Sequence, residues 1–173
     1  MSPISAKTPN ELLSTLDRMG IANTTTEHEA VMTVEQNQAL RGMIPGLHSK
    51  NLFLKDKKGQ LWLVVAEEDR PIDLKSLRKR IGAASLSFGK ADLLRHVLGV
   101  EPGSVTPFAV INDSDIHVRV VLDRALADGE RVNFHPLINT RSTTVSGSGL
   151  VEFLCRVGHD PLIIDFDSET MPS

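Results

Sequence analysis

Short hydrophobic runs separated by turn residues predict a sheet that is built partly from hairpins. Residues 52–54 are consecutive apolar residues, which is typical of a strand buried on both faces, and we expect this strand over residues 51–55. Turn residues at 56–59 and a longer apolar run at 61–66 follow directly. Two apolar runs joined by a short turn predict a β-hairpin.

Strand-like and helix-like segments alternate irregularly along the rest of the chain. Segments rich in β-branched and apolar residues predict strands over residues 21–28, 85–88, 108–111, 116–122, 131–135, 143–145 and 162–166. Apolar residues at helical spacing predict helices over residues 9–19, 33–40, 74–81, 91–98 and 148–157. This order predicts an α+β fold, with a mixed, largely antiparallel sheet flanked by helices.

Capping residues support the first two of these helices. Thr8 and Glu11 have the spacing of a capping box, and Pro9 occupies the first helical position. Thr33 and Gln36 repeat the capping pattern at the start of the second helix.

Composition is typical of one globular domain. The chain has 173 residues, of which 40% are hydrophobic and 24% charged, so residues 1–173 are long and apolar enough to form a single domain with a substantial core. No apolar run is long enough to cross a bilayer, and the N-terminus lacks the pattern of a signal peptide. Cys155 is the only cysteine, which excludes an intramolecular disulfide, and we expect its thiol in the core of the last helix. We therefore expect a cytoplasmic protein without a membrane anchor.

The net charge of −3 argues against a broad nucleic-acid-binding surface and leaves room for a local basic patch. The most basic stretch lies on the predicted helix 74–81, whose polar face carries Lys75, Arg78, Lys79 and Arg80. Such a face either guides nucleic-acid phosphates or is an ordinary solvated helix surface.

Lys50 is the first candidate for a binding site. It lies between a glycine-containing loop and the strand predicted at 51–55, so we expect it at the lip of that strand, where its ammonium could reach a phosphate in a cleft. The alternative is a lysine that ends a strand in water.

A second candidate is the loop 101–107, which contains two prolines and Gly103. Free backbone N–H groups beside a glycine can hold an ester carbonyl or a water, although an ordinary turn explains the same residues. Ser104 lacks the Gly-x-Ser-x-Gly elbow of a serine hydrolase, so we reject it as a nucleophile. His135 ends a predicted strand, and the six histidines are scattered without a metal-binding motif, so we expect neither a metal nor another cofactor.

Three separated segments resemble the YbaK/ProX family of aminoacyl-tRNA deacylases. They are PGLHSKNLFLKD at 45–56, GSVTPF at 103–108 and NFHPLIN at 133–139, in the order found in that family. Family members stand free or are inserted in bacterial prolyl-tRNA synthetase, and they hydrolyse the ester of mischarged tRNA. Within the family the chain is most similar to free-standing prolyl-tRNA editing proteins, which implies hydrolysis of Ala-tRNA(Pro), with tRNA(Pro) and prolyl-tRNA synthetase as partners.

The resemblance also implies that Lys50, the Gly103 loop and His135 converge on one pocket. In this family a ribose hydroxyl of the substrate helps a water attack the ester, without a protein nucleophile. Lys50 would then grip the terminal phosphate or orient the ribose, Asn51 would bind the terminal nucleotide, and His135 would fix the amino acid. The remaining substrate-binding candidates are Ser104, Val105, Thr106 and Pro107 of the loop, together with Met32, Thr33 and Phe134 around the amino-acid side chain.

Two alternatives stay open from the sequence. Leu47 and the segment 140–142 depart from the prolyl-tRNA editing pattern, which would suit a deacylase for tRNA charged with cysteine or serine. The fold also occurs as an appended domain, so a non-catalytic module that binds tRNA or a synthetase is the second alternative.

Overall fold

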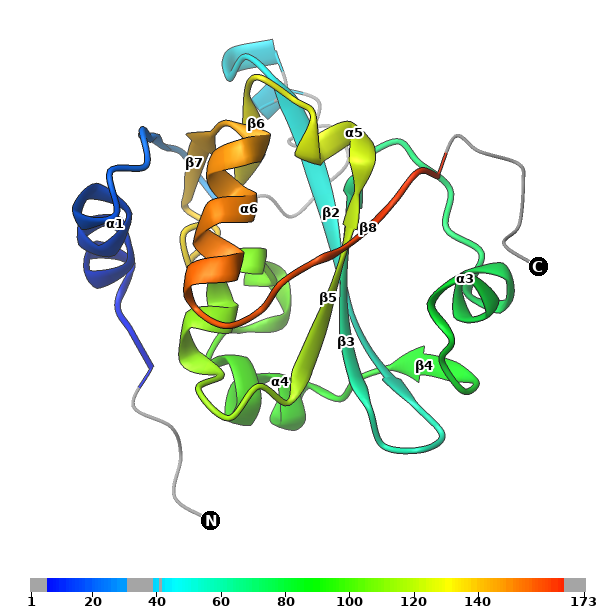
Figure 1. The fold of residues 1–173 in the computed structure, drawn as a ribbon. Helices are drawn as coiled ribbons and strands as arrows, with labels where there is room; N and C mark the ends of the chain where they lie inside the picture. Colours follow the sequence, from blue (N-terminus) through cyan, green and yellow to red (C-terminus); the bar gives the residue numbers. More distant parts are fainter. Residues whose placement is uncertain (1–5, 31–38, 41, 167–173) are drawn as a thin grey trace.

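A mixed eight-stranded sheet lies between helices on its two faces (Figure 1). The structure is a computed structural model that describes residues 6–30, 39–40 and 42–166. The strands are β1 (Thr24–Glu27), β2 (Leu47–Asp56), β3 (Leu61–Glu67), β4 (Leu86–Phe88), β5 (Val118–Asp123), β6 (Val132–Phe134), β7 (Arg141–Val145) and β8 (Leu162–Ile164). Their order in the sheet is β1-β7-β6-β2-β3-β5-β8, and β4 pairs with β2.

Among the described strands, four pairings are antiparallel and three are parallel. The antiparallel pairs are β1–β7, β2–β3, β2–β4 and β6–β7, and the parallel pairs are β2–β6, β3–β5 and β5–β8. The predicted α+β class with a mixed sheet is therefore confirmed. The predicted hairpin is also present, since β2 and β3 pair from Ser49↔Glu67 to Lys55↔Leu61.

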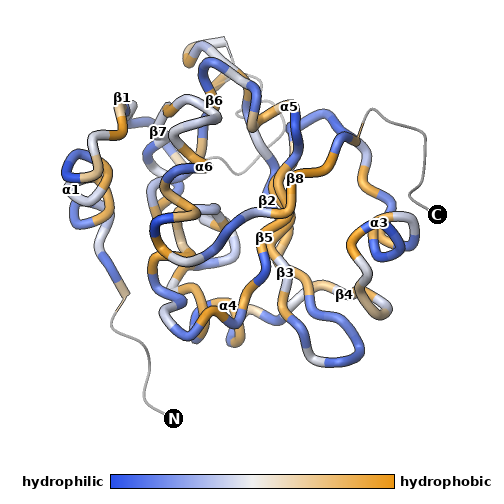
Figure 2. Tube along the Cα trace, viewed as in Figure 1, coloured by the Kyte–Doolittle hydropathy of each residue, from blue (hydrophilic) through white to orange (hydrophobic). Residues whose placement is uncertain are grey.

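The helices divide into two layers around the sheet (Figure 1). They are α1 (Pro9–Arg18), α3 (Leu74–Ile81), α4 (Ala91–Leu98), α5 (Arg124–Ala127) and α6 (Gly147–Arg156), with 3₁₀ segments η1 (Pro102–Ser104) and η2 (Pro107–Asn112). Residues of α1, α4, η2 and α6 share one large hydrophobic cluster, whereas α3 contributes to a smaller cluster on the other face. Hydrophobic colour follows β3 and β5 between these layers, while the β2–β3 turn is hydrophilic (Figure 2).

Local signals in the sequence account for the start of α1. The Thr8 side chain accepts a hydrogen bond from the Glu11 backbone N–H at 3.1 Å, and the Glu11 carboxylate accepts one from the Thr8 N–H at 2.9 Å. This reciprocal pair satisfies two N–H groups that the first turn would leave without partners. The predicted capping box is thus confirmed. Most of the second predicted helix, including Thr33 and Gln36, lies outside the described residues.

Two predictions about buried segments were wrong. The expected strand 108–111 is instead part of η2, because Pro107 fixes a helical first position and the Thr106 hydroxyl accepts a hydrogen bond from the Phe108 N–H. Cys155 is exposed rather than packed in the core. Helix α6 buries Leu150, Phe153 and Leu154, and Cys155 lies on its outer side.

None of the helices within the described residues has the length and apolar character needed to span a membrane.

Candidate functional site

The longest strand, β2, positions the candidate site. Its first residues pair with β6 at Leu47↔Val132 and His48↔Asn133, and its last residues pair with β4 from Leu54↔Phe88 to Asp56↔Leu86. Between these two pairings, no strand among the described residues pairs with β2 on that edge, and Gly103 and Val105 of the η1 loop line one pocket with Lys50 and Asn51. A polar pocket occupies this break in the sheet.

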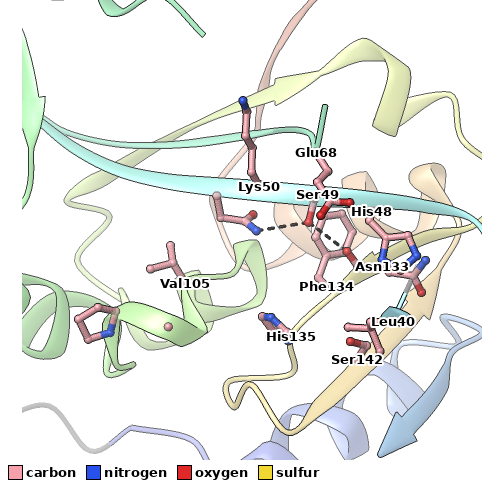
Figure 3. Close-up of a pocket in the computed structure, with 13 residues that line it drawn as sticks. Leu40, His48, Ser49, Lys50, Glu68, Val105, Asn133, Phe134, His135 and Ser142 are labelled. Carbon is pink, nitrogen blue, oxygen red and sulfur yellow. Dashed lines mark hydrogen bonds between the residues drawn. The ribbon is translucent and has the colours of Figure 1, made fainter. Parts of the chain in front are cut away.

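The pocket has a volume of about 200 Å³. Residues from β2, β6, β7 and the η1 loop meet in it, although they are up to about a hundred positions apart in sequence (Figure 3). The lining residues are Leu40, His48, Ser49, Lys50, Asn51, Glu68, Pro102, Gly103, Val105, Asn133, Phe134, His135 and Ser142. Six of the candidates from the sequence are therefore brought together, namely Lys50, Asn51, Gly103, Val105, Phe134 and His135.

A short chain of hydrogen bonds fixes the β2 side of the pocket (Figure 3). The Asn51 amide donates to the Ser49 hydroxyl at 3.3 Å, and that hydroxyl donates to the Asn133 backbone oxygen at 3.0 Å. The side-chain oxygen of Asn51 is buried and has no hydrogen-bond partner among the described residues. A buried acceptor without a partner destabilises the folded state by about 1–3 kcal/mol. This oxygen is therefore suited to accept a hydrogen bond from a ligand.

His135 lies immediately after β6 and is held by β7. Its Nδ1 is 3.0 Å from the Arg141 backbone oxygen, which can only accept, so Nδ1 carries the proton. Burial lowers the pKa of His135, and the neighbouring His28 lowers it further. The neutral ring is therefore favoured, and its Nε2 atom can accept a hydrogen bond from a ligand.

His28 and Ser142 belong to the same region, and sequence reasoning missed both. The rings of His28 and His135 are 6.2 Å apart, and His28 Nε2 lies 2.8 Å from the hydroxyl of Ser142, which lines the pocket. Their proximity depends on the register of β1 with β7, which places Glu27 opposite Arg141. No local sequence motif predicts the pairing of β1 with β7, because the two strands are far apart in the chain.

The placement of Lys50 corrects the expected geometry. Strand β2 begins at Leu47, so Lys50 lies inside the strand rather than at its lip. Side chains alternate along a strand, and Leu52 and Leu54 belong to the cluster on the α3 face. Lys50 is among the lining residues, but its side chain points away from Val105 and His135 (Figure 3).

The η1 loop also differs in part from expectation. Gly103 lines the pocket, but the Ser104 N–H donates to the Glu101 oxygen at 2.8 Å and is not available to an ester carbonyl. Ser104, Thr106 and Pro107 are buried and are not among the described residues that line the pocket. They therefore shape the loop instead of contacting the cavity.

The three candidates expected around the amino-acid side chain have different outcomes. Met32 and Thr33 are outside the described residues. Phe134 lines the pocket and packs edge-to-face on Phe108 at 5.7 Å, with only 2% of its surface exposed.

No group of three or more His, Cys, Asp or Glu residues is placed to hold a metal ion in the part of the chain that the structure describes.

The predicted basic face on α3 is smaller than the sequence implies, and α3 covers the other face of the sheet from α4 and α6 (Figure 1). Lys75 and Lys79 are exposed, and Arg78 is partly exposed. Arg80 instead donates to the Asp165 backbone oxygen at 2.8 Å, and its guanidinium lies 5.6 Å from the centre of the Phe166 ring. Arg80 is therefore engaged in packing of the C-terminal segment.

Comparison with known proteins shows the family. The profile of the aminoacyl-tRNA editing domain matches residues 28–153, so the chain belongs to the aminoacyl-tRNA editing domain family, and the resemblance to YbaK/ProX proteins is confirmed. "Prolyl-tRNA synthetase associated domain-containing protein 1" of Danio rerio is 38% identical over 159 residues, covering 91% of this chain and 86% of that protein. The prolyl-tRNA editing protein ProX of Acetoanaerobium sticklandii is 39% identical over 136 residues, covering 78% of this chain and 83% of that protein.

A solved structure supports the fold assignment. A crystal structure described as a trans-editing enzyme for prolyl-tRNA synthetase superposes with a TM-score of 0.68 over 93% of this chain and 98% of its own. The two sequences are 18% identical, so this likeness concerns the fold alone.

Proposed function

We propose that this protein is a trans-editing hydrolase that removes alanine from mischarged tRNA(Pro). The family assignment and the similarity to ProX support hydrolysis of an aminoacyl-tRNA. The observation that carries the proposal is the pairing, in one small pocket, of two hydrogen-bond acceptors, Asn51 Oδ1 and the Nε2 atom of neutral His135. An aminoacyl ester brings matching donors, its α-ammonium group and the adjacent ribose hydroxyl.

The reaction requires little acid–base chemistry from the protein. Water attacks the ester carbonyl carbon, the bond to the ribose oxygen breaks, and that oxygen leaves with a proton as the amino acid is released. His135 Nε2 accepts a hydrogen bond from the α-ammonium group and holds the carbonyl in position. Asn51 Oδ1 accepts one from the ribose hydroxyl, which lies beside the ester. Correct orientation of this kind contributes a large part of many enzymatic rate enhancements.

Lys50 has a separate role in this proposal. Because its side chain points away from His135, its ammonium contacts a phosphate of the RNA at the rim and not the ester (Figure 3). A compact, flexible ammonium is suited to such a point contact.

Pocket size supports a small amino acid. The cavity of about 200 Å³ is below the roughly 300–1,000 Å³ of pockets for drug-sized ligands. A synthetase pocket built for proline cannot exclude alanine well, since a missing methylene changes the free energy of discrimination by only about 1–3 kcal/mol. A second, smaller site is therefore needed. It admits the alanyl group and excludes the prolyl ring by steric overlap with the pocket wall, so only the mischarged tRNA is hydrolysed.

The proposal is tested by release of alanine from Ala-tRNA(Pro) by the purified protein and its His135→Ala variant. We expect hydrolysis by the parent, loss of most activity in the variant and normal activity in His117→Ala, because His117 is exposed and outside the pocket. Absence of hydrolysis with retained tRNA binding would favour a non-catalytic module instead.

A further inference from the structure

A second and larger cavity lies at the other end of β2, where β4 meets the start of α4. It has a volume of about 680 Å³. We call it the Phe88 groove and define it by five of its lining residues, Lys55, Lys57, Phe88, Lys90 and Leu93. Phe88 is 65% exposed, which makes it one of the two most exposed large hydrophobic residues in the described part of the chain.

Strand pairing fixes the backbone around Phe88. Phe88 is paired with Leu54 across β4 and β2, and the Gly89 N–H donates to the Phe53 backbone oxygen at 2.9 Å. The Phe53 ring fills the interior beside Gly89 so closely that a Cβ there would lie 2.4 Å from it. The chain thus holds a large aromatic ring in solvent at the mouth of a cavity, where exposed apolar surface often marks a binding site.

The charge of the groove favours an anionic partner. Lys55, Lys57 and Lys90 are all exposed. Two carboxylates also line the cavity, one of them buried and the other almost fully exposed in a surface ion pair. Asp56 is buried and accepts hydrogen bonds from the Trp62 indole at 3.2 Å and the Lys58 N–H at 2.9 Å, and Asp92 lies 3.2 Å from Arg95. Three exposed ammonium groups therefore gather in a chain whose net charge is −3.

We propose that the Phe88 groove binds an unpaired stretch of RNA, with a base stacked on Phe88 and phosphates contacting Lys55, Lys57 and Lys90. Exposed aromatic rings flanked by cationic side chains are the usual means of holding single-stranded nucleic acid, since every base has a face that can stack. The identification of this RNA as part of the tRNA substrate rests on the proposed function.

The groove and the first pocket lie on the same strand. Asn51 and Lys55 are four residues apart on β2, about 13 Å from each other. Phe53 lies between them on the same face, is 5% exposed and belongs to the core, so an RNA that reaches both sites passes outside this face, over the surface that covers Phe53.

Binding of uncharged tRNA and of a short single-stranded RNA tests the aromatic contact. Phe88→Leu keeps an apolar side chain but removes the aromatic face, and we expect its dissociation constant to rise about 5- to 150-fold. Phe88→Trp should bind as well as the parent. Leu162→Ala is the matched control, because Leu162 is 45% exposed and lies outside the groove. Equal affinity of the parent and Phe88→Leu would overturn the stacking contact.

The lysines are tested through the salt dependence of the same binding. If each lysine neutralises one phosphate of a single strand, each of Lys55→Gln, Lys57→Gln and Lys90→Gln should reduce the slope of log K against log salt by about 0.7. Lys58→Gln is the control, since Lys58 is exposed in the same turn but does not line the groove. If inorganic polyphosphate displaces RNA equally from the parent and from Phe88→Leu, the groove is a charged patch without base stacking.

Deacylation assays separate this inference from the proposed function. If Phe88→Leu weakens RNA binding and raises KM for charged tRNA without changing kcat, both proposals hold. Weaker RNA binding by the variant together with no hydrolysis by any form would retain the RNA site and overturn the proposed reaction. If the parent protein is active and Phe88→Leu has a normal KM, the proposed reaction is retained and the RNA site is overturned.

Discussion

The backbone oxygen of Arg141 accepts a hydrogen bond from Nδ1 of His135 at 3.0 Å, and this bond fixes the tautomer of the ring in the pocket. The bond depends on the pairing of β6 with β7, which brings the end of one strand beside the start of the other. The ring nitrogen that remains, Nε2, is an acceptor as long as the ring is neutral. The protonation state of His135 therefore decides whether the pocket can bind a cationic amine.

We predict that His135 titrates below the ordinary histidine value of 6.5, because burial and His28 both lower its pKa. The acidic limb of the deacylation profile should accordingly lie below pH 6.5. Two-dimensional NMR of the His135 imidazole ring measures this midpoint directly. A His135 midpoint at or above 6.5 would contradict the neutral ring.

The same shift has a consequence for stability. Between the lowered pKa and 6.5 the unfolded chain binds more protons than the folded one, so His135 makes the free energy of unfolding fall as the pH drops through this window. Replacing His135 by Gln should remove that component of the pH dependence. Urea unfolding of both proteins at several pH values above and below 6.5 checks the difference, and parallel curves would contradict it.

Lys50→Ala should lower kcat/KM for charged tRNA by about 5- to 150-fold, since a charge-assisted hydrogen bond contributes about 1–3 kcal/mol. Its melting temperature should change little, because the side chain is only partly buried and points away from Val105 and His135 (Figure 3). Lys7→Ala serves as a control at an exposed position. Full activity of Lys50→Ala would place the phosphate contact elsewhere.

Replacement of both Lys75 and Lys79 by Gln tests whether α3 contacts tRNA. If each contacts one phosphate of a duplex region, the slope of the salt dependence should fall by about 0.9 per residue. Arg80 is left unchanged, because its guanidinium is bound to the Asp165 carbonyl. Equal slopes for variant and parent would make this face an ordinary solvated surface.

A buried hydrogen bond outside the pocket predicts a loss of stability. Asp113 and His159 are 3.0 Å apart, and their side chains are 1% and 0% exposed. Asp113→Ala leaves a buried nitrogen of His159 without its hydrogen-bond partner and should reduce the free energy of unfolding by about 1–3 kcal/mol. Urea unfolding at pH 7 measures the change, with the isosteric Asp113→Asn as the milder variant. A loss below about 1 kcal/mol, the range typical of exposed pairs, would contradict the buried geometry.

Acid should weaken the same pair. Burial opposes ionisation of Asp113, but hydrogen bonds from His159 and from the His117 and Val118 N–H groups outweigh it, so the pKa lies below its ordinary value of 3.8. The resulting stabilisation is present above pH 3.8 and is lost as the pH falls from there through the lowered pKa.

Local physical chemistry explains which features were predictable from the sequence. The capping box at Thr8 depends on residues three positions apart, and the β2–β3 hairpin pairs residues that a short turn connects; both are confirmed. The strand predicted at 108–111 was wrong because a short run of apolar residues suits a buried helix as well as a strand. Pro107 and the Thr106 cap favour the 3₁₀ helix that is observed.

The site was harder to predict because it depends on register between distant strands. The alternation that turns Lys50 away from His135 follows from the true start of β2 at Leu47, four residues before the predicted start. The contribution of His28 depends on the pairing of β1 with β7, to which no turn or cap gives a clue. The family resemblance predicted the convergence on one pocket, whereas only the three-dimensional structure gives the direction of each side chain.

The most direct test of the account is a deacylation panel in which the purified protein meets Ala-tRNA(Pro), Pro-tRNA(Pro), Cys-tRNA(Pro) and a seryl-tRNA. A pocket of about 200 Å³ should admit the alanyl group and exclude the prolyl ring, because a close-packed wall tolerates little added volume. We expect rapid hydrolysis of Ala-tRNA(Pro) and almost none of Pro-tRNA(Pro). Cleavage of the cysteinyl or seryl substrate with Ala-tRNA(Pro) left intact would contradict the alanine assignment, and failure to cleave any of the four would contradict the proposed hydrolysis itself.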